Sequence, residues 1–282
     1  MARPYRSALY IPASRERALD KARGLSCDAI LFDLEDAVAP EEKVRARETL
    51  AAALASGGYG ARARLVRING LDTEWGEDDL RAAAGLACDG VLVPKVDGPA
   101  TLDRVAALVP DLPLWAMMET PAGILNAAAI CAHPRLAGIV MGTNDLAKDL
   151  RTRPGHRREP LLHALSACLL AARAHGRVAI DGVYNAFRDA EGLEAECAQG
   201  RDLGFDGKSL IHPDQIALAN AAFAPTGAEI DLARRQIAAF DEASAAGQGV
   251  AVVDGRIVEN LHVATARETL SRAEAIAALE TT

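Results

Sequence analysis

Two acidic residues near the middle of the chain have the type and spacing needed to share one divalent cation. Glu119 follows the short apolar run Leu114–Met118, and Asp145 follows a second run, Gly138–Met141. Short apolar runs of this kind are typical of buried β-strands. Two carboxylates at adjacent strand ends can bind the same ion, so this pair is the first candidate for a functional site.

The segment between the two runs predicts a strand, a helix and a second strand. Ala122–Ile130 has apolar residues at helical spacing and follows Pro121, which suits the first turn of a helix. Such a unit is right-handed and its strands are parallel, so both carboxylates would leave the same face of the sheet. Asp145 has a second interpretation, as the N-cap of a helix that begins near Leu146.

Other polar side chains accompany the remaining predicted strands and favour a cation site over isolated salt bridges. They are Glu35 and Asp36 after Ala29–Leu34, Arg67 within Leu65–Ile68 and Asp181 after Val178–Ile180. Several buried like charges on one rim need a cation or protons to coexist. Because no His or Cys cluster accompanies them, the set suits Mg²⁺, or Mn²⁺, bound by one or two carboxylates with water and substrate oxygens.

An arginine, a lysine and a glycine-containing turn complete the predicted rim. Arg67 can bind a substrate carboxylate in a bidentate manner, or it can form a salt bridge across the mouth of the site. The turn Gly142-Thr143-Asn144 can present backbone N–H groups to an anionic oxygen. Lys95, after the predicted strand Val91–Val93, is the best candidate for Schiff-base chemistry, and Lys148 and Lys208 are weaker candidates. The many carboxylates favour the metal, so we interpret Lys95 as a structural or electrostatic residue.

The elements that position these residues form a repeating pattern. Eight short apolar strands alternate with helices over roughly 200 residues, as in the TIM (β/α)₈ barrel, where reactive groups lie on the loops after the strands. The first and last strands are predicted at Arg6–Ile11 and Gly207–Ile211, and Ser14 is the expected N-cap of the first helix. A doubly wound open sheet is the alternative, although no G-x-G-x-x-G follows the first strand.

The alternation stops near Pro225, which predicts a barrel domain over residues 1–224 and a C-terminal extension over residues 225–282. The extension reads as a helix over Ala228–Ala246, a short strand over Val250–Val253 and a final helix over Ala264–Leu279. This extension could be a lid, or it could pack on a neighbouring subunit.

Composition limits the partners and the compartment. The chain of 282 residues is 50% hydrophobic and 25% charged, with a net charge of −8. This charge argues against nucleic acid or an anionic membrane as the main partner. Five scattered cysteines without a C-x-x-C pair indicate buried free thiols in a reducing compartment. No apolar run approaches the ~20 residues of a membrane span and no signal-peptide core is present, so we expect a cytoplasmic protein.

An ordered set of motifs resembles a known family. The motifs are RSALYIPAS, DAILFDLEDAV followed by EEK, LVRING, VLVPKV, MMETPAGILNA, GTNDLAKDL, IDGVY and GFDGKSLIHPDQI, and they extend from about Arg6 to Gln215. In this order they resemble the citrate lyase beta subunit-like and malyl-CoA lyase enzymes of the HpcH/HpaI aldolase superfamily.

The resemblance implies a TIM barrel assembled as a homotrimer or hexamer. It implies Mg²⁺-dependent cleavage or formation of a 3-hydroxyacyl-CoA such as malyl-CoA, citramalyl-CoA or citryl-CoA, with an acyl-CoA and a 2-oxo acid as the other partners. By resemblance, Glu119 and Asp145 bind the metal and Arg67 binds the carboxylate of the 2-oxo acid. Glu35 and Asp36 hold metal-bound water and neighbouring groups.

The resemblance also assigns roles outside this rim. A tail aspartate from an adjacent subunit acts as the acid/base in malyl-CoA lyases, which points to Asp254 in V-D-G-R-I-V, with Glu259 as the alternative. Arg6 and Tyr10 are implied contacts of the CoA substrate. The sixth-strand motif reads G-T-N-D-L where many members have G-x-E-D-L, so the substrate acid stays open.

Three other functions remain open on the sequence. The first is hydrolysis of an acyl-CoA thioester by the same site. The second is the role of a citrate lyase beta subunit that acts within a complex on an acyl-carrier partner. The third, a barrel without enzymatic activity, is the least favoured of the three.

Overall fold

The chain folds into two compact units. The computed structural model describes residues 3–153, 155 and 157–281. One unit is Tyr5–Phe223, and the other contains the described residues of Ala224–Thr282 and of Met1–Pro4. None of the helices in the described residues is long and apolar enough to cross a membrane.

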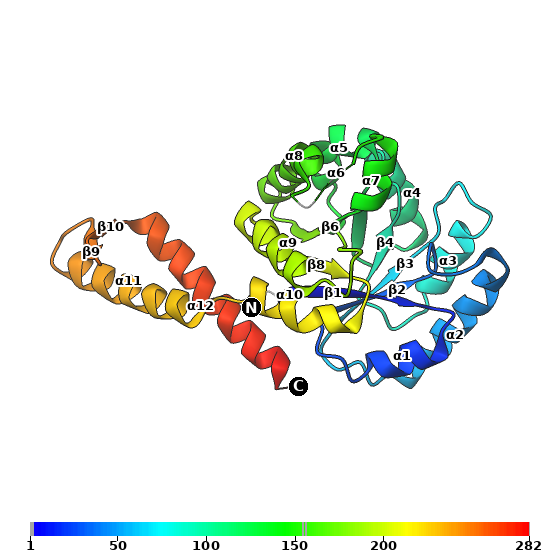
Figure 1. Ribbon diagram of the computed structural model, residues 1–282, viewed down its shortest axis with the longest axis horizontal. Coiled ribbons are helices and arrows are strands. Elements are labelled where there is room, and N and C mark those ends of the chain that lie inside the picture. Colours follow the sequence, from blue (N-terminus) through cyan, green and yellow to red (C-terminus); the bar gives the residue numbers. More distant parts are fainter. Residues whose placement is uncertain (1–2, 154, 156, 282) are drawn as a thin grey trace. The chain divides into compact units, whose positions relative to one another are not determined.

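The unit Tyr5–Phe223 is a closed barrel of eight parallel strands with helices outside them (Figure 1). The strands are β1 (Ser7–Pro12), β2 (Ala29–Asp33), β3 (Ala63–Arg67), β4 (Gly90–Val93), β5 (Leu114–Met118), β6 (Leu136–Met141), β7 (Val178–Asp181) and β8 (Gly207–Leu210). Each strand pairs with the next, and β8 pairs with β1, so this sheet has no edge. The prediction of a (β/α)₈ barrel is confirmed, and the open-sheet alternative is wrong.

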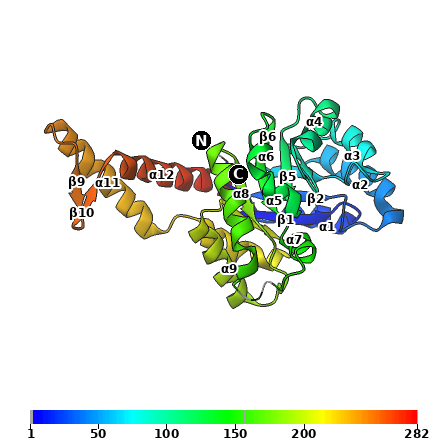
Figure 2. The same ribbon diagram turned by 90° about the horizontal axis from the view of Figure 1, so that it is seen from above.

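The described part of this unit also has ten α-helices and three 3₁₀ turns, of which the last helix and the last 3₁₀ turn follow β8 and the others connect successive strands. Figure 2 shows helices around the barrel. The helices are α1 (Glu16–Ala22), α2 (Lys43–Ser56), α3 (Gly76–Ala83), α4 (Pro99–Leu108), α5 (Pro121–Leu125), α6 (Ala127–Cys131), α7 (Thr143–Asp149), α8 (Leu162–Ala174), α9 (Ala190–Leu203) and α10 (Ile216–Phe223). The 3₁₀ turns are Pro40–Glu42, Glu159–Leu161 and Pro213–Gln215.

Two predictions about these helices were wrong. The single helix expected over Ala122–Ile130 is two short helices separated at Asn126, whose side-chain amide donates to the Asp97 carbonyl at 2.7 Å. The helix is therefore interrupted at Asn126, the residue that makes this contact with the preceding loop. Ser14 does not cap α1, because the N-cap position is Arg15 and no side chain caps it.

Alternation along the strands divides the buried residues between the inside and the outside of the barrel. The inner cluster consists of Ala8, Ala29, Leu31, Ala63, Leu65, Leu92, Trp115, Met117, Val140 and Ile180. Gly138 is required there, because a Cβ at this position would lie 2.4 Å from the Trp115 ring. A larger cluster fills the space between strands and helices. The apolar interior supports the polar residues at the C-terminal strand ends from below.

The second unit contains α11 (Gly227–Ala245), a hairpin of β9 (Ala251–Val253) and β10 (Arg256–Val258), and α12 (Asn260–Glu280). Ala251, Val258 and Val263 form its buried cluster. The strand β10 was not predicted, and α12 begins four residues earlier than expected. That this segment is a lid or an intersubunit element stays a prediction.

Candidate active site

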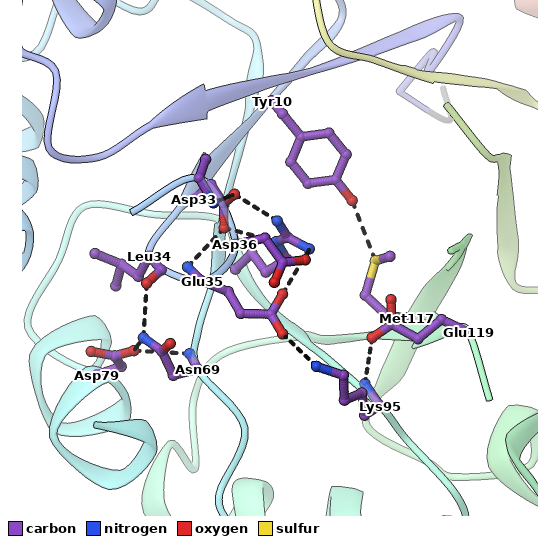
Figure 3. Close-up of polar contacts among 12 residues, drawn as sticks. Tyr10, Asp33, Leu34, Glu35, Asp36, Asn69, Asp79, Lys95, Met117 and Glu119 are labelled. Carbon is purple, nitrogen blue, oxygen red and sulfur yellow. Dashed lines mark hydrogen bonds and ion pairs between the residues drawn. The ribbon is translucent and has the colours of Figure 1, made fainter. Parts of the chain in front are cut away.

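The strand ends of the barrel surround a cavity of about 300 Å³. Its polar lining residues are Tyr10, Asp33, Asp36, Arg67, Glu119, Thr143, Asn144 and Asp145. The cavity therefore brings together the predicted metal ligands, the predicted arginine and one acid of the pair after the second strand. Figure 3 shows how Tyr10 of β1, Asp33 and Asp36 at the end of β2 and Glu119 after β5 converge.

Glu119 is fixed at one oxygen and open at the other. Its side chain is only 2% exposed, and its Oε1 accepts the Lys95 backbone N–H at 2.7 Å. Its Oε2 lies beside Gly142, where a Cβ would approach to 2.5 Å. Burial raises the pKa of Glu119 to about 7, with Glu35 and Asp145 adding to the rise and the Lys95 N–H and Arg67 opposing it.

Asp145 lies in the first turn of α7 and is half-buried. Its interpretation as an N-cap is wrong, because α7 begins at Thr143 and Gly142 occupies the cap position. Within the described part of the chain, no hydrogen bond or ion pair engages its carboxylate. Its negative charge nevertheless contributes to the raised pKa of Glu119. Two acids on one cavity, each with oxygen not engaged by protein donors, are a chemical fit for a divalent cation.

Glu119 and Asp145 are the two candidate protein ligands for this cation. Among the described residues, no group of three or more His, Cys, Asp or Glu is arranged to hold a metal ion. Mg²⁺ is commonly held by one or two carboxylates and keeps several waters. Glu119 and Asp145 would therefore supply the protein ligands, and water or substrate oxygens the others.

Arg67 is held by three acids. Its Nε and Nη2 donate to the two carboxylate oxygens of Asp33 at 2.8 and 2.6 Å. Its Nη1 lies 2.7 Å from Glu35 Oε2 and 3.4 Å from Asp36 Oδ2. Asp33 thus occupies the Nε–Nη2 edge of the guanidinium, which could otherwise bind a substrate carboxylate through two hydrogen bonds. A substrate carboxylate would meet the Nη1 side, where the Asp36 side chain is 61% exposed.

Glu35 and Lys95 connect this arginine to Glu119. Lys95 Nζ lies 3.3 Å from Glu35 Oε1 and its backbone adopts a left-handed conformation with φ +48°. Burial lowers the pKa of Lys95, but the negative charges of Glu35 and Glu119 have the larger effect. The pKa of Lys95 is therefore above its ordinary value. A charged, ion-paired amine is a poor nucleophile, which agrees with the electrostatic interpretation of Lys95 over a Schiff base.

Sequence reasoning missed the residues that support this rim. Asp33 was read as part of a strand, yet it pairs in register with Arg67 of the neighbouring strand. The alternation of Leu31 and Asp33 could have placed both inside the barrel. Lys43 was also missed: its Nζ donates to the carbonyls of Leu34 and Glu35 at 3.1 and 2.9 Å and fixes the acidic loop.

The glycine-containing turn is only partly available to an anion. The Gly142 N–H donates to the Met118 carbonyl at 3.1 Å, so it cannot serve the predicted anion nest. Thr143 and Asn144 do line the cavity. Gly142 instead matters because it has no side chain, which leaves room for Glu119.

Two predicted residues lie elsewhere in the barrel. Arg6 precedes β1, at the opposite end of the strand from the cavity, and forms a buried bidentate pair with Asp28 at 3.0 and 2.9 Å. This position does not fit a substrate contact. Asp181 points outward rather than to the rim, because it binds Arg158 at 2.8 Å and Lys208 at 3.1 Å outside the barrel.

The two tail acids belong to the second unit. Asp254 lies in the β9–β10 turn with φ +50°, and Arg235 of α11 donates to both of its carboxylate oxygens at 2.7 and 2.9 Å. Glu259 precedes α12, and its backbone N–H donates to His262 Nδ1 at 3.1 Å. The role of Asp254 at a neighbouring subunit stays a prediction.

The fold and this site define a (β/α)₈-barrel protein with an acidic cavity and one arginine at the C-terminal strand ends. The chain belongs to the HpcH/HpaI aldolase/citrate lyase family, whose model matches residues 6–213. The resemblance drawn from the motifs is confirmed.

Similar proteins carry the names of enzymes that act on CoA thioesters. A (3S)-malyl-CoA thioesterase of Cereibacter sphaeroides is 66% identical, over 98% of this chain and 97% of its own length. An L-malyl-CoA/beta-methylmalyl-CoA lyase of the same species is 35% identical, over 98% and 97%. The CitE protein of Mycobacterium tuberculosis, solved with magnesium, acetoacetate and coenzyme A, has a TM-score of 0.81 and 32% identity, covering 97% of this chain and 98% of its own.

Proposed function

We propose that this protein hydrolyses the thioester bond of a malyl-CoA-type substrate, with Mg²⁺ as its metal. The observation that carries the proposal is the 66% identity, over 98% of the chain, to a (3S)-malyl-CoA thioesterase. The sequence favoured carbon–carbon bond cleavage and kept hydrolysis as the alternative. The similar proteins support the alternative better than the first choice.

The cavity suits a substrate with a carboxylate, a hydroxyl and a thioester. Glu119 and Asp145 would hold the cation, which when bound stabilises negative charge on substrate oxygens as a Lewis acid. The Nη1 side of Arg67 would bind the substrate carboxylate once Asp36 shifts. Lys95 and Arg67 hold Glu35 in place from both sides, so the rim is preorganised before substrate arrives.

Hydrolysis needs a base for the attacking water, and Asp36 is the acid best placed for it. Asp36 lines the cavity and keeps 61% of its side chain exposed. The water oxygen bonds to the thioester carbonyl carbon while Asp36 takes one proton. The carbon–sulfur bond then breaks, the sulfur keeps the electron pair, and Asp36 returns the proton to give CoA thiol and the free acid.

Carbon–carbon cleavage is the second candidate, favoured by the 35% identity to L-malyl-CoA/beta-methylmalyl-CoA lyase. In that reaction Asp254 from a neighbouring subunit of a trimer or hexamer would exchange a proton with the acyl-CoA α-carbon. The two candidates differ in products. Hydrolysis gives malate and free CoA thiol, whereas cleavage gives acetyl-CoA and glyoxylate.

The test is a product assay on the purified full chain with (3S)-malyl-CoA and Mg²⁺. We expect release of free thiol without acetyl-CoA, and loss of that release in Glu119→Gln and Asp145→Asn. Glu77→Gln, an exposed acid on α3, is the matched control and should keep the wild-type rate. Formation of acetyl-CoA and glyoxylate in place of thiol would contradict hydrolysis and support the lyase. Absence of turnover on free CoA thioesters would favour a carrier-bound partner.

Metal binding can be measured without turnover. A saturating cation stabilises the folded protein by about 2.7 kcal/mol at 100 times its dissociation constant. We therefore expect Mg²⁺ to raise the Tm of the wild type and of Glu77→Gln, and to leave the Tm of Glu119→Gln and Asp145→Asn unchanged. An equal shift in all four proteins would place the metal elsewhere.

A further inference from the structure

Tyr10 forms a hydrogen bond to a sulfur atom on the opposite side of the barrel. It belongs to β1, and its hydroxyl donates to the Met117 sulfur of β5 at 3.3 Å (Figure 3). In the closed order of strands, β5 lies four positions from β1, on the far side of the barrel. The Tyr10 side chain therefore reaches from β1 to β5 along the wall of the cavity that it helps to line.

The partner of this hydroxyl is a weak acceptor. A thioether sulfur accepts hydrogen bonds poorly compared with a carbonyl or carboxylate oxygen. The ring is itself held in place, because the Arg67 guanidinium lies 4.8 Å from its centroid. Tyr10 thus combines a fixed ring with a hydroxyl proton that a better acceptor can take over by simple rotation of the O–H bond.

The hydroxyl stays protonated at neutral pH. Burial raises the pKa of Tyr10 far above its ordinary value; Arg67 opposes the rise, and Asp33 and Glu119 add to it. Tyr10 is therefore a neutral donor among acids, and it cannot compete with Glu119 or Asp145 for a cation.

Two other side chains with donor groups at the cavity, Arg67 and Asn144, already donate to protein acceptors. Arg67 serves Asp33, Glu35 and Asp36. The amides of Asn144 and Asn185 donate to each other at 3.2 and 2.7 Å. The acids of the lining can only accept while they are ionised. A thioester carbonyl oxygen is also an acceptor, and the Tyr10 hydroxyl, which donates only to the Met117 sulfur, is a donor that can turn to it.

We propose that the Tyr10 hydroxyl turns from Met117 to the carbonyl oxygen of the substrate thioester and donates a hydrogen bond that stabilises the negative charge arising there during hydrolysis. This inference rests on the proposed thioester hydrolysis. Water adds to the carbonyl carbon, the carbonyl electron pair moves onto oxygen, and Tyr10 donates without losing its proton. The charge returns to the carbon–oxygen bond as the carbon–sulfur bond breaks.

The test compares Tyr10→Phe with Met117→Leu in the thiol-release assay. Tyr10→Phe removes only the hydroxyl, whereas Met117→Leu removes its resting acceptor in a volume-conserving change. A donor that acts on the developing oxyanion is typically worth 100-fold or more in kcat. We expect Tyr10→Phe to lose roughly 100-fold in kcat with KM within about threefold of wild type. Met117→Leu should stay within about threefold in both constants.

Tm and Mg²⁺ affinity by calorimetry accompany the kinetics, and both should match the wild type in the two variants. A kcat of Tyr10→Phe within threefold of wild type would overturn the role of Tyr10, as would an equal loss in both variants, which would make the Tyr10–Met117 bond structural. If the wild type itself releases no thiol from malyl-CoA, the proposed hydrolysis fails and the inference falls with it. The two failures are therefore distinguishable.

Discussion

Asp33 and Arg67 lie opposite each other in register at the ends of β2 and β3 and form a bidentate ion pair inside the barrel mouth. The two bonds measure 2.8 and 2.6 Å, and the side chains are 1% and 9% exposed. The pair determines which part of the guanidinium faces the cavity, because Nε and one side of Nη2 are used by Asp33. The substrate-facing part is the Nη1 side that Glu35 and Asp36 share.

Replacing Asp33 should disturb both stability and substrate binding. In Asp33→Asn the buried arginine loses its charged partner but keeps Glu35, so we expect about 3 kcal/mol of lost unfolding free energy, at the low end for a broken buried pair. The guanidinium should also turn, which raises KM more than it lowers kcat. Urea unfolding and steady-state kinetics measure the two effects.

The control for this variant is Asp89→Asn. Asp89 forms a similar bidentate contact with Arg64, but both side chains are 28% exposed. Solvent screens such a pair, so we expect a loss of about 1 kcal/mol or less and no change in KM. Equal losses of unfolding free energy in Asp33→Asn and Asp89→Asn would contradict the prediction that the buried Asp33–Arg67 pair stabilises the fold more than the exposed pair does.

Gly142 should be essential to the metal site although it offers no ligand. In Gly142→Ala the new Cβ would lie 2.4 Å from Glu119 Cβ and 2.5 Å from Oε2, so the carboxylate must move. We expect a weaker Mg²⁺ affinity by at least about 10-fold, as for other changes that displace a ligand indirectly. Calorimetric titration with Mg²⁺ is the measurement. The control is Gly24→Ala, where the atom nearest to the new Cβ is 3.8 Å away, and it should bind Mg²⁺ as the wild type does. An unchanged Mg²⁺ affinity in Gly142→Ala would contradict the role of Glu119 as a metal ligand.

Asp181 should make the barrel sensitive to acid. Burial raises the pKa of this carboxyl, but Lys208 and Arg158 outweigh it, so the pKa lies below its ordinary value of 3.8. A carboxyl with a lowered folded-state pKa stabilises the protein above its unfolded-state pKa, and this stabilisation is lost as the pH falls through the folded-state value.

The variant Asp181→Asn isolates this contribution. At pH 7 it should be less stable than the wild type by about 3 kcal/mol, because the two buried cations Arg158 and Lys208 then share Glu196 as their only ion-pair partner among the described residues. The difference should narrow as the pH falls below about 4. Urea midpoints between pH 3 and 7 test the trend, with the exposed acid variant Glu48→Gln as control. A constant difference across that range would rule out ionisation of Asp181 as its cause.

Several features were predictable because they are properties of short segments. Apolar runs of strand length alternating with helices predicted the barrel, and the strand bounds moved by only one or two residues at most ends. Glu119 and Asp145 could be paired because parallel strands bring consecutive C-terminal ends to one rim. Arg67 was found in the same way. Asp181 was placed wrongly because a strand end alone does not tell which face its last residue occupies.

The order of amino acids alone determined the barrel, the family and the acids at the ends of its neighbouring strands, because strand length, helical spacing and motif order are local properties of the chain. Only the tertiary structure decided which partners those acids have. It joined Asp33 to Arg67, turned Asp181 outward to Arg158, placed Arg6 at the far end of its strand, and set Tyr10 against Met117. These choices depend on register, closure and side-chain direction, and each of these is set by residues far apart in the chain.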